Sequence, residues 1–216
     1  MGHLFLSGGG DQEQTKAFDR FFAEKVNKDK PLLYIPVAME TTDYNDCLEW
    51  IKTVFNPLGI RSITMWTDLN NKSVRDLQSF SAIYIGGGNT FSLLKNLRTT
   101  KFDGILKEYL KNDGILYAGS AGAIIAGADI MTCAHMDPNN VNLQETDGLK
   151  LINNYSVWCH YSEQDDQLIK AYIKDYKNPV IALSEETGVY YCDGNIKVIG
   201  EIPSYVFNKL ATSERI

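Results

Sequence analysis

Short apolar runs alternate with helical patterns over the first 128 residues of the sequence. The apolar runs have the length of strands buried on both faces, and each is followed by a segment with apolar residues at helical spacing. The predicted strands are 3–7, 32–37, 60–66, 82–85 and 115–118, and the predicted helices are 12–27, 43–55, 73–79, 89–97 and 102–112. Strands that alternate with helices pair in parallel, and the helices cover both faces of their sheet. We therefore predict an α/β fold, with a three-layer, doubly wound, mostly parallel sheet.

The alternation is less regular beyond residue 128. Residues 132–146 are polar and rich in Asn, as expected for a long loop near a site or a flap over it. The elements predicted after this loop are a strand at 155–159, a helix at 163–176, a strand at 180–184, a hairpin of 189–192 with 196–199 around Asp193-Gly194, and a last strand at 204–207. The sequence shows no linker or repeat, so we expect residues 1–216 to form a single domain.

Charge and cysteine content exclude several classes of protein. With 21 basic and 27 acidic residues the net charge is −6, so we expect no nucleic acid and no anionic membrane surface as partner. No apolar stretch approaches the roughly 18 to 20 residues that a membrane helix needs. The four cysteines are widely spaced, and the N-terminal residues enter a strand-like run without a basic, apolar leader, which together favour a cytoplasmic protein. Composition leaves a monomer and a homodimer equally open.

Ser120 lies at a predicted junction of strand and helix. The segment 117–127 reads Tyr-Ala-Gly-Ser-Ala-Gly-Ala-Ile-Ile-Ala-Gly, in which an apolar strand enters a sharp turn and a small-residue helix leaves it. Such a turn can strain a serine so that its hydroxyl projects above the sheet edge, with the next N–H, that of Ala121, free to donate to an oxyanion. The same small residues would also suit a tight turn with no chemical role, and the sequence favours neither interpretation.

Ligands of open parallel sheets bind beyond the carboxyl ends of the strands, where the sequence places Ser120, His160 and Glu185. A serine hydroxyl needs an adjacent base, and the base needs an orienting acid. His160 is the best candidate base, because His3 opens a strand at the opposite edge and His135 lies in the polar loop. Glu185 is the preferred acid, although Glu186 follows it directly. As an isolated pattern, a pair of solvated loop carboxylates is as plausible.

Two glycine-rich turns also follow predicted strands. Residues 86–90, Gly-Gly-Gly-Asn-Thr, lack the ending of a nucleotide P-loop, and the N–H of Gly88 is better suited to serve as an oxyanion donor opposite Ala121. Residues 8–10 are predicted to form a plain turn. The cysteines and histidines do not have the spacing of a metal site, so we expect neither a metal nor another cofactor.

The glycine-rich segment 85–94, the serine segment 117–123, His160 after a strand and Leu-Ser-Glu-Glu at 183–186 together resemble the peptidase E (aspartyl dipeptidase) family of serine peptidases. The similarity runs over nearly the whole chain. The resemblance implies a fold like that of class I glutamine amidotransferases. It also implies a triad of Ser120, His160 and Glu185 with an oxyanion hole from Gly88 and Ala121, and a chain order that differs from that of α/β-hydrolases.

The sequence departs from the family pattern beside the serine and in the presumed substrate pocket. Ala118 and Gly119 stand where the family usually has a glycine and then a variable, often bulky residue. His135, with Asp137 close by, occupies the place of a family aspartate, and residues 161–173 lack the family's substrate-binding arginine and contain only Lys170. A strict requirement for N-terminal aspartate is therefore not expected. Asn89, His135 and Asp137 are the candidate substrate-binding residues.

These features predict a serine peptidase that hydrolyses short peptides, with a small peptide as its partner. Ser120 would attack the carbonyl, His160 would transfer the proton and Glu185 would orient the imidazole. The sequence is also compatible with two alternatives. One is a β-aspartyl peptide hydrolase resembling cyanophycinase, and the other is a non-catalytic protein that binds a small ligand on the same scaffold.

Overall fold

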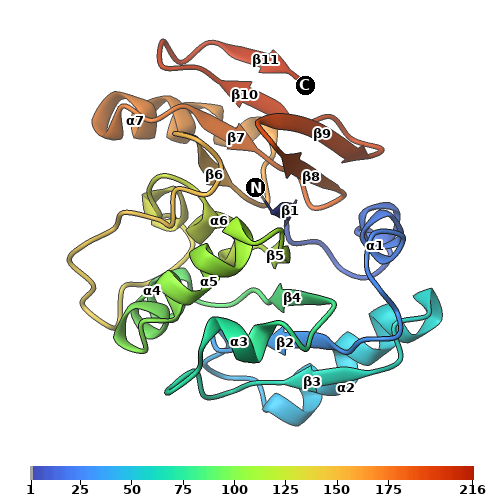
Figure 1. Cartoon of the computed structure of the whole chain (residues 1–216). Coiled ribbons are helices and arrows are strands. Elements are labelled where there is room, and N and C mark those ends of the chain that lie inside the picture. The colour runs from blue at the N-terminus through green and yellow to red at the C-terminus, as the bar shows by residue number, and fades with distance from the viewer. Residues whose placement is uncertain (1) are drawn as a thin grey trace.

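The computed structural model describes residues 2–216, so Met1, the first residue of the predicted domain, lies outside it. Its larger sheet consists of β1 (His3–Ser7), β2 (Leu32–Ile35), β3 (Ile63–Met65), β4 (Ala82–Ile85), β5 (Ile115–Gly119), β8 (Thr187–Cys192) and β9 (Asn195–Gly200). The strand order is β3-β2-β4-β5-β1-β8-β9 (Figure 1), in which the first five strands are parallel and the last two antiparallel. The predicted α/β class and the mostly parallel sheet are confirmed.

Helices cover both faces of this sheet. One face carries α1 (Lys16–Ala23) and α2 (Tyr44–Phe55), with a short helix η1 (Asn56–Leu58). The other carries α4 (Thr90–Thr99), α5 (Phe102–Lys111) and α6 (Ala121–Ala126), with α3 (Val74–Leu77) beside α5. Each helix buries its apolar side against the strands, which gives the three predicted layers.

Helix α1 is shorter than the predicted segment 12–27. The Asp11 carboxylate accepts hydrogen bonds from the N–H groups of Glu13 and Gln14. These bonds form a local turn, which competes with the helix for the same N–H groups. The helix therefore begins only at Lys16, and Gln14 is left on the turn that faces the carboxyl edge of the sheet.

A second, four-stranded sheet was not anticipated from the sequence. It contains β6 (Ser156–Trp158), β7 (Val180–Ala182), β10 (Tyr205–Phe207) and β11 (Ser213–Arg215), in the order β11-β10-β7-β6. Its helical cover is α7 (Asp166–Tyr176), which follows η3 (Glu163–Asp165) and packs through Ile169 and Ile173. Strands β6 and β7 were predicted correctly as elements, but they pair with each other and not with the larger sheet.

The two sheets meet at their carboxyl edges. The His160 N–H, after the end of β6, donates to the Gly8 carbonyl after the end of β1 (3.0 Å), while the Gly8 N–H donates within the larger sheet to the Thr187 carbonyl of β8 (3.0 Å). A Cβ at position 8 would lie 1.8 Å from the Ser184 carbonyl oxygen, so only glycine allows this approach. The ends of β6 and β7 are thereby brought against the end of β1, beside that of β5.

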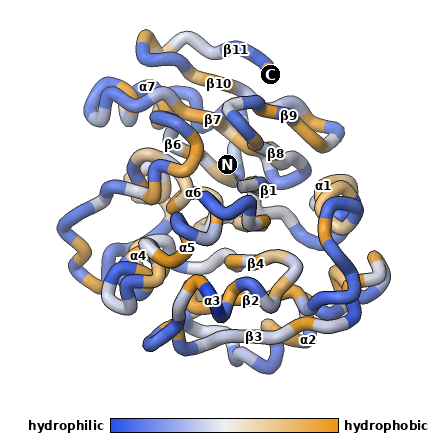
Figure 2. Tube along the Cα trace, in the orientation of Figure 1, coloured by the Kyte–Doolittle hydropathy of each residue, from blue (hydrophilic) through white to orange (hydrophobic). Residues whose placement is uncertain are grey.

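The predicted hairpin and polar loop are both present. Asp193 and Gly194 have φ of +49° and +84°, as a type I′ turn between β8 and β9 requires. After η2 (Met131–Cys133), the polar segment up to residue 146 projects at the left of Figure 1 and is largely hydrophilic in Figure 2, in contrast to the strands of the interior. The Arg98 guanidinium connects it to α4 by donating to the Glu145 carbonyl within the segment and to the Asp147 carbonyl just after it (2.7 Å). Among residues 2–216, no helix has the length and apolar character that crossing a bilayer would require.

Candidate active site

Ser120 occupies a strained turn between β5 and α6. Its φ of +47° and ψ of −109° are unusual for a residue with a side chain. The surrounding backbone fixes this conformation, because the Ser120 N–H donates to the Ser7 carbonyl (3.1 Å) and its carbonyl accepts from Ile124 (2.9 Å). The small residues also serve packing, since a Cβ at position 122 would lie 2.7 Å from the Ile85 carbonyl oxygen. Close packing and a partly exposed serine are thus both properties of this turn.

His160 follows β6 and faces Ser120. Its Nε2 lies 2.8 Å from the Ser120 Oγ, and its backbone has a positive φ of +54°. Gly9, with φ of +103°, passes directly beside the pair: a Cβ at this position would lie 2.6 Å from the His160 Cε1 and 2.8 Å from the Ser120 Cβ. Glycine at position 9 therefore leaves the space that the imidazole and the serine occupy.

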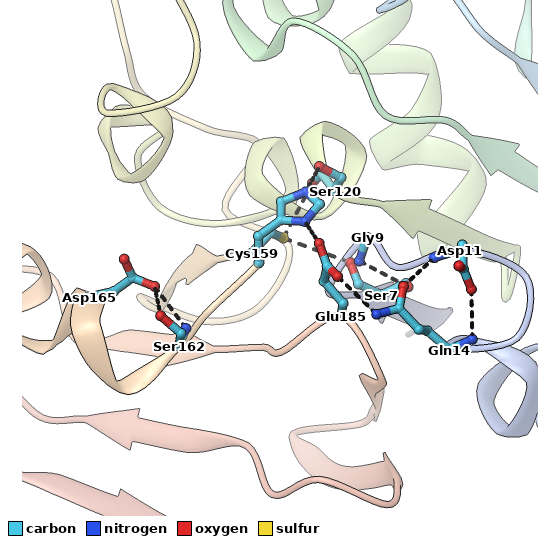
Figure 3. A network of polar contacts seen from close by, with 10 residues as sticks. Ser7, Gly9, Asp11, Gln14, Ser120, Cys159, Ser162, Asp165 and Glu185 are labelled. Carbon is cyan, nitrogen blue, oxygen red and sulfur yellow. Dashed lines mark hydrogen bonds and ion pairs between the residues drawn. The ribbon is translucent and has the colours of Figure 1, made fainter.

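Glu185 follows β7 and is the carboxylate that meets the imidazole. Its Oε1 lies 2.9 Å from the His160 Nδ1, and its Oε2 accepts from the Gln14 side chain (3.0 Å; Figure 3). The hydrogen bond from His160, and then that from Gln14, lowers the pKa of Glu185, with partial burial opposing them. An ionised carboxylate can only accept, so Nδ1 donates to Glu185 and Nε2 is left to accept from the Ser120 hydroxyl. The neighbouring Glu186 instead lines a separate surface cavity with Glu13 and Lys16.

The glycine-rich turn after β4 passes on the other side of Ser120. A Cβ at Gly87 would lie 3.2 Å from the Ser120 Cβ, and Gly88 has a φ of +131° with the Ala38 carbonyl oxygen 2.3 Å from its would-be Cβ. Within residues 2–216, the N–H groups of Gly87, Gly88 and Ala121 donate no hydrogen bond to a protein acceptor. Free donors beside a serine hydroxyl are what an oxyanion hole needs.

Two of the three predicted substrate-binding residues hold the polar loop on the glycine-rich turn. The Asn89 side chain caps α4 by accepting from Ser92 (2.9 Å) and donates to the Pro138 carbonyl (2.9 Å). The Asp137 carboxylate accepts from the Thr90 N–H (2.8 Å). His135 is exposed and stacks on Trp158, with ring centroids 4.4 Å apart. A role of these residues in substrate binding stays a prediction.

Sequence reasoning missed Gln14 and Cys159 and assigned Gly9 only to a plain turn. The Cys159 Sγ lies 3.5 Å from the Ser120 carbonyl oxygen and 3.7 Å from the Ser7 carbonyl oxygen, so its one S–H can donate to either. Burial raises the pKa of this thiol, which keeps it a neutral donor. Glycine after a central strand was a usable signal for Gly9. No local pattern marks Gln14, because its partner lies 171 residues away.

A cavity of about 150 Å³ opens beside Ser120 on the side of α1 and α2. Ser120, Gly119 and Gly87 line one end, and Asp19 and Thr15 line another part of the wall. Burial raises the pKa of Asp19 to about 6, although hydrogen bonds from Tyr117 and Thr15 act in the opposite direction.

No metal-ligand cluster is found in the described part of the chain. Residues 2–216 contain no group of three His, Cys, Asp or Glu side chains placed to hold a metal ion.

Comparison with known proteins places this geometry in a family. The model of peptidase family S51 matches residues 4–199. The chain is 28% identical over 198 residues to an uncharacterized peptidase of Listeria monocytogenes, covering 88% of this chain and 94% of that protein. It is 27% identical over 197 residues to peptidase E of Haemophilus influenzae, covering 83% and 79% respectively.

Solved structures show the same fold. The crystal structure of a peptidase from an acI-B1 actinobacterium superposes with a TM-score of 0.75 at 21% identity, and the match covers 100% of this chain and 94% of the other. The related proteins have the glutamine amidotransferase-like fold that the sequence resemblance implied. Because the family model extends over nearly all of the sequence, the chain belongs to peptidase family S51 and is a serine-type peptidase.

Proposed function

We propose that this peptidase is a dipeptidase-like exopeptidase that cleaves short peptides with Ser120, His160 and Glu185 as its catalytic residues. The observation that carries the proposal is the continuous chain of hydrogen bonds from the Ser120 hydroxyl through His160 and Glu185 to Gln14. Each link has the length of an ordinary hydrogen bond, so the serine, the imidazole and the carboxylate are placed for proton transfer.

The proposed reaction has two steps. The Ser120 Oγ attacks the peptide carbonyl while its proton moves to the His160 Nε2, and Glu185 stabilises the imidazolium. The imidazolium then protonates the leaving amine as the C–N bond breaks, which yields an acyl-enzyme. In the second step His160 takes a proton from water and the hydroxide oxygen attacks the ester carbonyl. The C–O bond to the Ser120 Oγ then breaks while the imidazolium returns its proton to that oxygen, and the acyl group leaves as a carboxylic acid.

Backbone donors would stabilise the negative charge that develops on the carbonyl oxygen in both steps. Gly88 follows Gly87, which passes beside Ser120, and Ala121 follows the serine in the chain; the N–H groups of Gly88 and Ala121 make no bond to another protein group within residues 2–216. Donors that are fixed before the reaction do not need to reorganise, and losing one such donor commonly costs about 10²- to 10³-fold in rate.

The proposed substrates are short peptides whose first residue need not be aspartate. Lys170 is the only cationic side chain in residues 161–173, and its Nζ lies 3.9 Å from the Asp166 carboxylate, which already offers it a counter-ion. This leaves little in that segment to attract a substrate carboxylate. All four cysteines are free thiols, which supports the further proposal that the enzyme works in the reducing cytoplasm.

The test is hydrolysis of a dipeptide panel by the wild-type protein and by Ser120→Ala. The panel contains N-terminal aspartyl, neutral and basic dipeptides together with β-aspartyl peptides, and free amino acids are quantified. We expect turnover of α-linked dipeptides that disappears in Ser120→Ala, and labelling of Ser120 by a fluorophosphonate. Turnover confined to β-aspartyl peptides would favour the cyanophycinase-like alternative. Folded protein that neither turns over nor is labelled would contradict the proposal.

A further inference from the structure

The cavity beside Ser120 has one charged side chain in its wall. Its lining combines apolar and aromatic residues, Met39, Trp50, Val54 and Tyr84, with Asp19. No Lys, Arg, His or Glu side chain contributes to the lining among residues 2–216. We call this cavity the Asp19 pocket. It is a mostly apolar cavity next to a nucleophile with a single anionic group, which is a frequent composition of ligand sites.

Asp19 is buried without a cation to balance it. Its side chain is only 3% exposed, and its two oxygens accept from the Tyr117 hydroxyl (2.7 Å) and the Thr15 hydroxyl (2.8 Å). Within residues 2–216, no basic group forms an ion pair with it. Hydroxyl donors reduce the cost of burying a carboxylate but bring no opposite charge. Each carboxylate oxygen can accept a second hydrogen bond, so acceptor capacity remains.

The aromatic part of the lining also favours a positive charge. Trp50 is 40% exposed and packs edge-on to Tyr84, with centroids 6.3 Å apart. The faces of aromatic rings attract cations, most strongly where water is excluded. Burial, followed by the charge of Asp19, raises the pKa of Tyr84, so this phenol remains a neutral hydroxyl.

Glycine at position 119 keeps the pocket open toward the serine. A Cβ there would lie 3.3 Å from the Tyr84 hydroxyl oxygen, and Gly119 itself lines the pocket. A larger side chain at this position would enter the space between Ser120 and Tyr84. The pocket is therefore continuous with the place where the reacting carbonyl would sit.

We propose that the Asp19 pocket binds a protonated amine of the substrate. This inference rests on the proposed peptidase function for the identity of the substrate. The amine can come from the N-terminal ammonium group of a short peptide or from a basic side chain of its first residue, and both share the same chemistry. Asp19 supplies the counter-charge, and the cation supplies the partner that the buried carboxylate lacks.

Asp19→Asn is the variant that tests the charge. The asparagine amide can accept from Tyr117 through its oxygen and donate to the Thr15 oxygen through its nitrogen, while Thr15 donates to the Asp11 carbonyl (2.9 Å). The substitution therefore preserves both contacts and removes only the charge. Glu13→Gln is the matched control, because it removes a carboxylate from the exposed surface of the same segment.

The experiment measures binding separately from turnover. In a Ser120→Ala background, calorimetry compares three ligands: Ala-Ala, N-acetyl-Ala-Ala and N-acetyl-Lys-Ala. We expect Asp19→Asn to weaken binding of the amine-bearing ligand by about 10- to 100-fold, as for a hydrogen bond to a charged group, and to leave N-acetyl-Ala-Ala unchanged. Loss confined to Ala-Ala identifies the N-terminal ammonium group, and loss confined to N-acetyl-Lys-Ala identifies the side chain.

Equal effects on all three ligands, or none on any, would overturn the inference. A second variant, Gly119→Ala, narrows the pocket without changing its charge, and it too should weaken binding of the amine-bearing ligand. Unaltered binding in this variant would mean that substrate does not enter the pocket. Because binding is read without catalysis, charge-dependent binding in a protein that cleaves no peptide would refute the proposed function and leave the inference standing.

Discussion

The two faces of the larger sheet are built from different side chains. The face under α1 and α2 is aromatic and contains Phe5, Phe22, Phe55, Tyr84 and Tyr117. The face under α4, α5 and α6 is mainly aliphatic, with leucine, isoleucine and alanine packed around α6. Both faces are closed to solvent. The buried carboxylate of Asp19 lies on the aromatic side, whereas that of Asp129, also buried, follows α6 at the end of the aliphatic layer.

The aliphatic and aromatic side chains give the two faces different roles. The aliphatic face seats the short helix that follows Ser120, where alanine and glycine let the backbone approach the sheet closely. The aromatic face supplies hydroxyl groups, because tyrosine brings a polar end into an apolar layer, and Tyr117 donates one of them to Asp19. We infer that one face positions the nucleophile and the other shapes the pocket beside it.

The largest effect should come from the aromatic face. Phe22 is fully buried, and its ring lies edge-on to those of Phe5 and Tyr117, each with centroids 5.1 Å away. Phe22→Ala should lower the free energy of unfolding by about 4 kcal/mol. Leu94→Ala, a fully buried counterpart on α4, should cost about 3 kcal/mol. Urea denaturation measures both, and a much smaller loss for Phe22→Ala would show that the aromatic cluster is not tightly packed.

The aliphatic face should be intolerant of added volume at one glycine. In Gly122→Ala the new Cβ would lie 2.7 Å from the Ile85 carbonyl oxygen, which is backbone and cannot turn aside. We expect a loss of about 2 kcal/mol and a large fall in kcat, since α6 must shift and it follows Ser120.

Gly104→Ala in α5 is the control for this substitution. No atom lies within 4 Å of its added Cβ, so alanine should raise stability by up to about 1 kcal/mol through helix propensity alone. Equal effects of the two glycine substitutions on stability and kcat would contradict close packing of α6.

The buried carboxylate of the aromatic face should reduce stability. The pKa of Asp19 is raised from 3.8 to about 6, so the folded state holds this proton more tightly than the unfolded state. Stability therefore falls as pH rises from about 4 to 6, and the loss persists above that range. Asp19→Asn should be about 2 kcal/mol more stable than the wild type at pH 8, with the difference vanishing near pH 4.

Thermal unfolding across this pH range measures the effect, which corresponds to a Tm increase of about 4 to 8 °C for a chain of this size. Glu13→Gln should change Tm little, because its carboxylate is exposed. A destabilised Asp19→Asn at pH 8 would mean that the carboxylate is retained for its hydrogen bonds to Tyr117 and Thr15. Asp19 would then have a structural role, and the aromatic face would no longer be distinguished from the aliphatic face by a functional carboxylate.

Local signals predicted most of the elements and the residues at the ends of the strands, although strand β11 was not predicted and α1 begins later than expected. Ser120, His160 and Glu185 each follow an apolar run, and the carboxyl ends of parallel strands gather at one edge. The division into two sheets was not predictable in this way. Strands β6 and β7 are apolar like those of the larger sheet, and their periodicity carries no information about which strands they pair with.

Residues whose partners are distant in the chain could not be predicted from the sequence either. Asp19 lies in an amphipathic helix, where an acidic residue is expected to face solvent, and its partner Tyr117 is 98 residues away. Gln14 was placed inside a predicted helix, whereas the Asp11 turn keeps it outside and directs it to Glu185. Neither contact has a signature in composition, spacing or periodicity.

The smallest effect that we expect concerns Gln14, on the turn before α1. In Gln14→Leu the Glu185 Oε2 loses an N–H donor, so the pKa of Glu185 should rise toward its ordinary value while the bond to His160 remains. The active form needs this carboxylate ionised, so the acid limb of the pH profile of kcat/KM should move to higher pH. Because the site is partly exposed, kcat/KM should fall by less than about tenfold.

Gln12→Leu is the control. It removes a comparable amide, bonded to the Thr53 carbonyl (3.1 Å), and should leave the pH profile of kcat/KM unchanged. If Gln14→Leu lowers kcat/KM equally at all pH values, Gln14 only supports the turn before α1. The aromatic face would then form the pocket beside Ser120 without influencing the ionisation of Glu185.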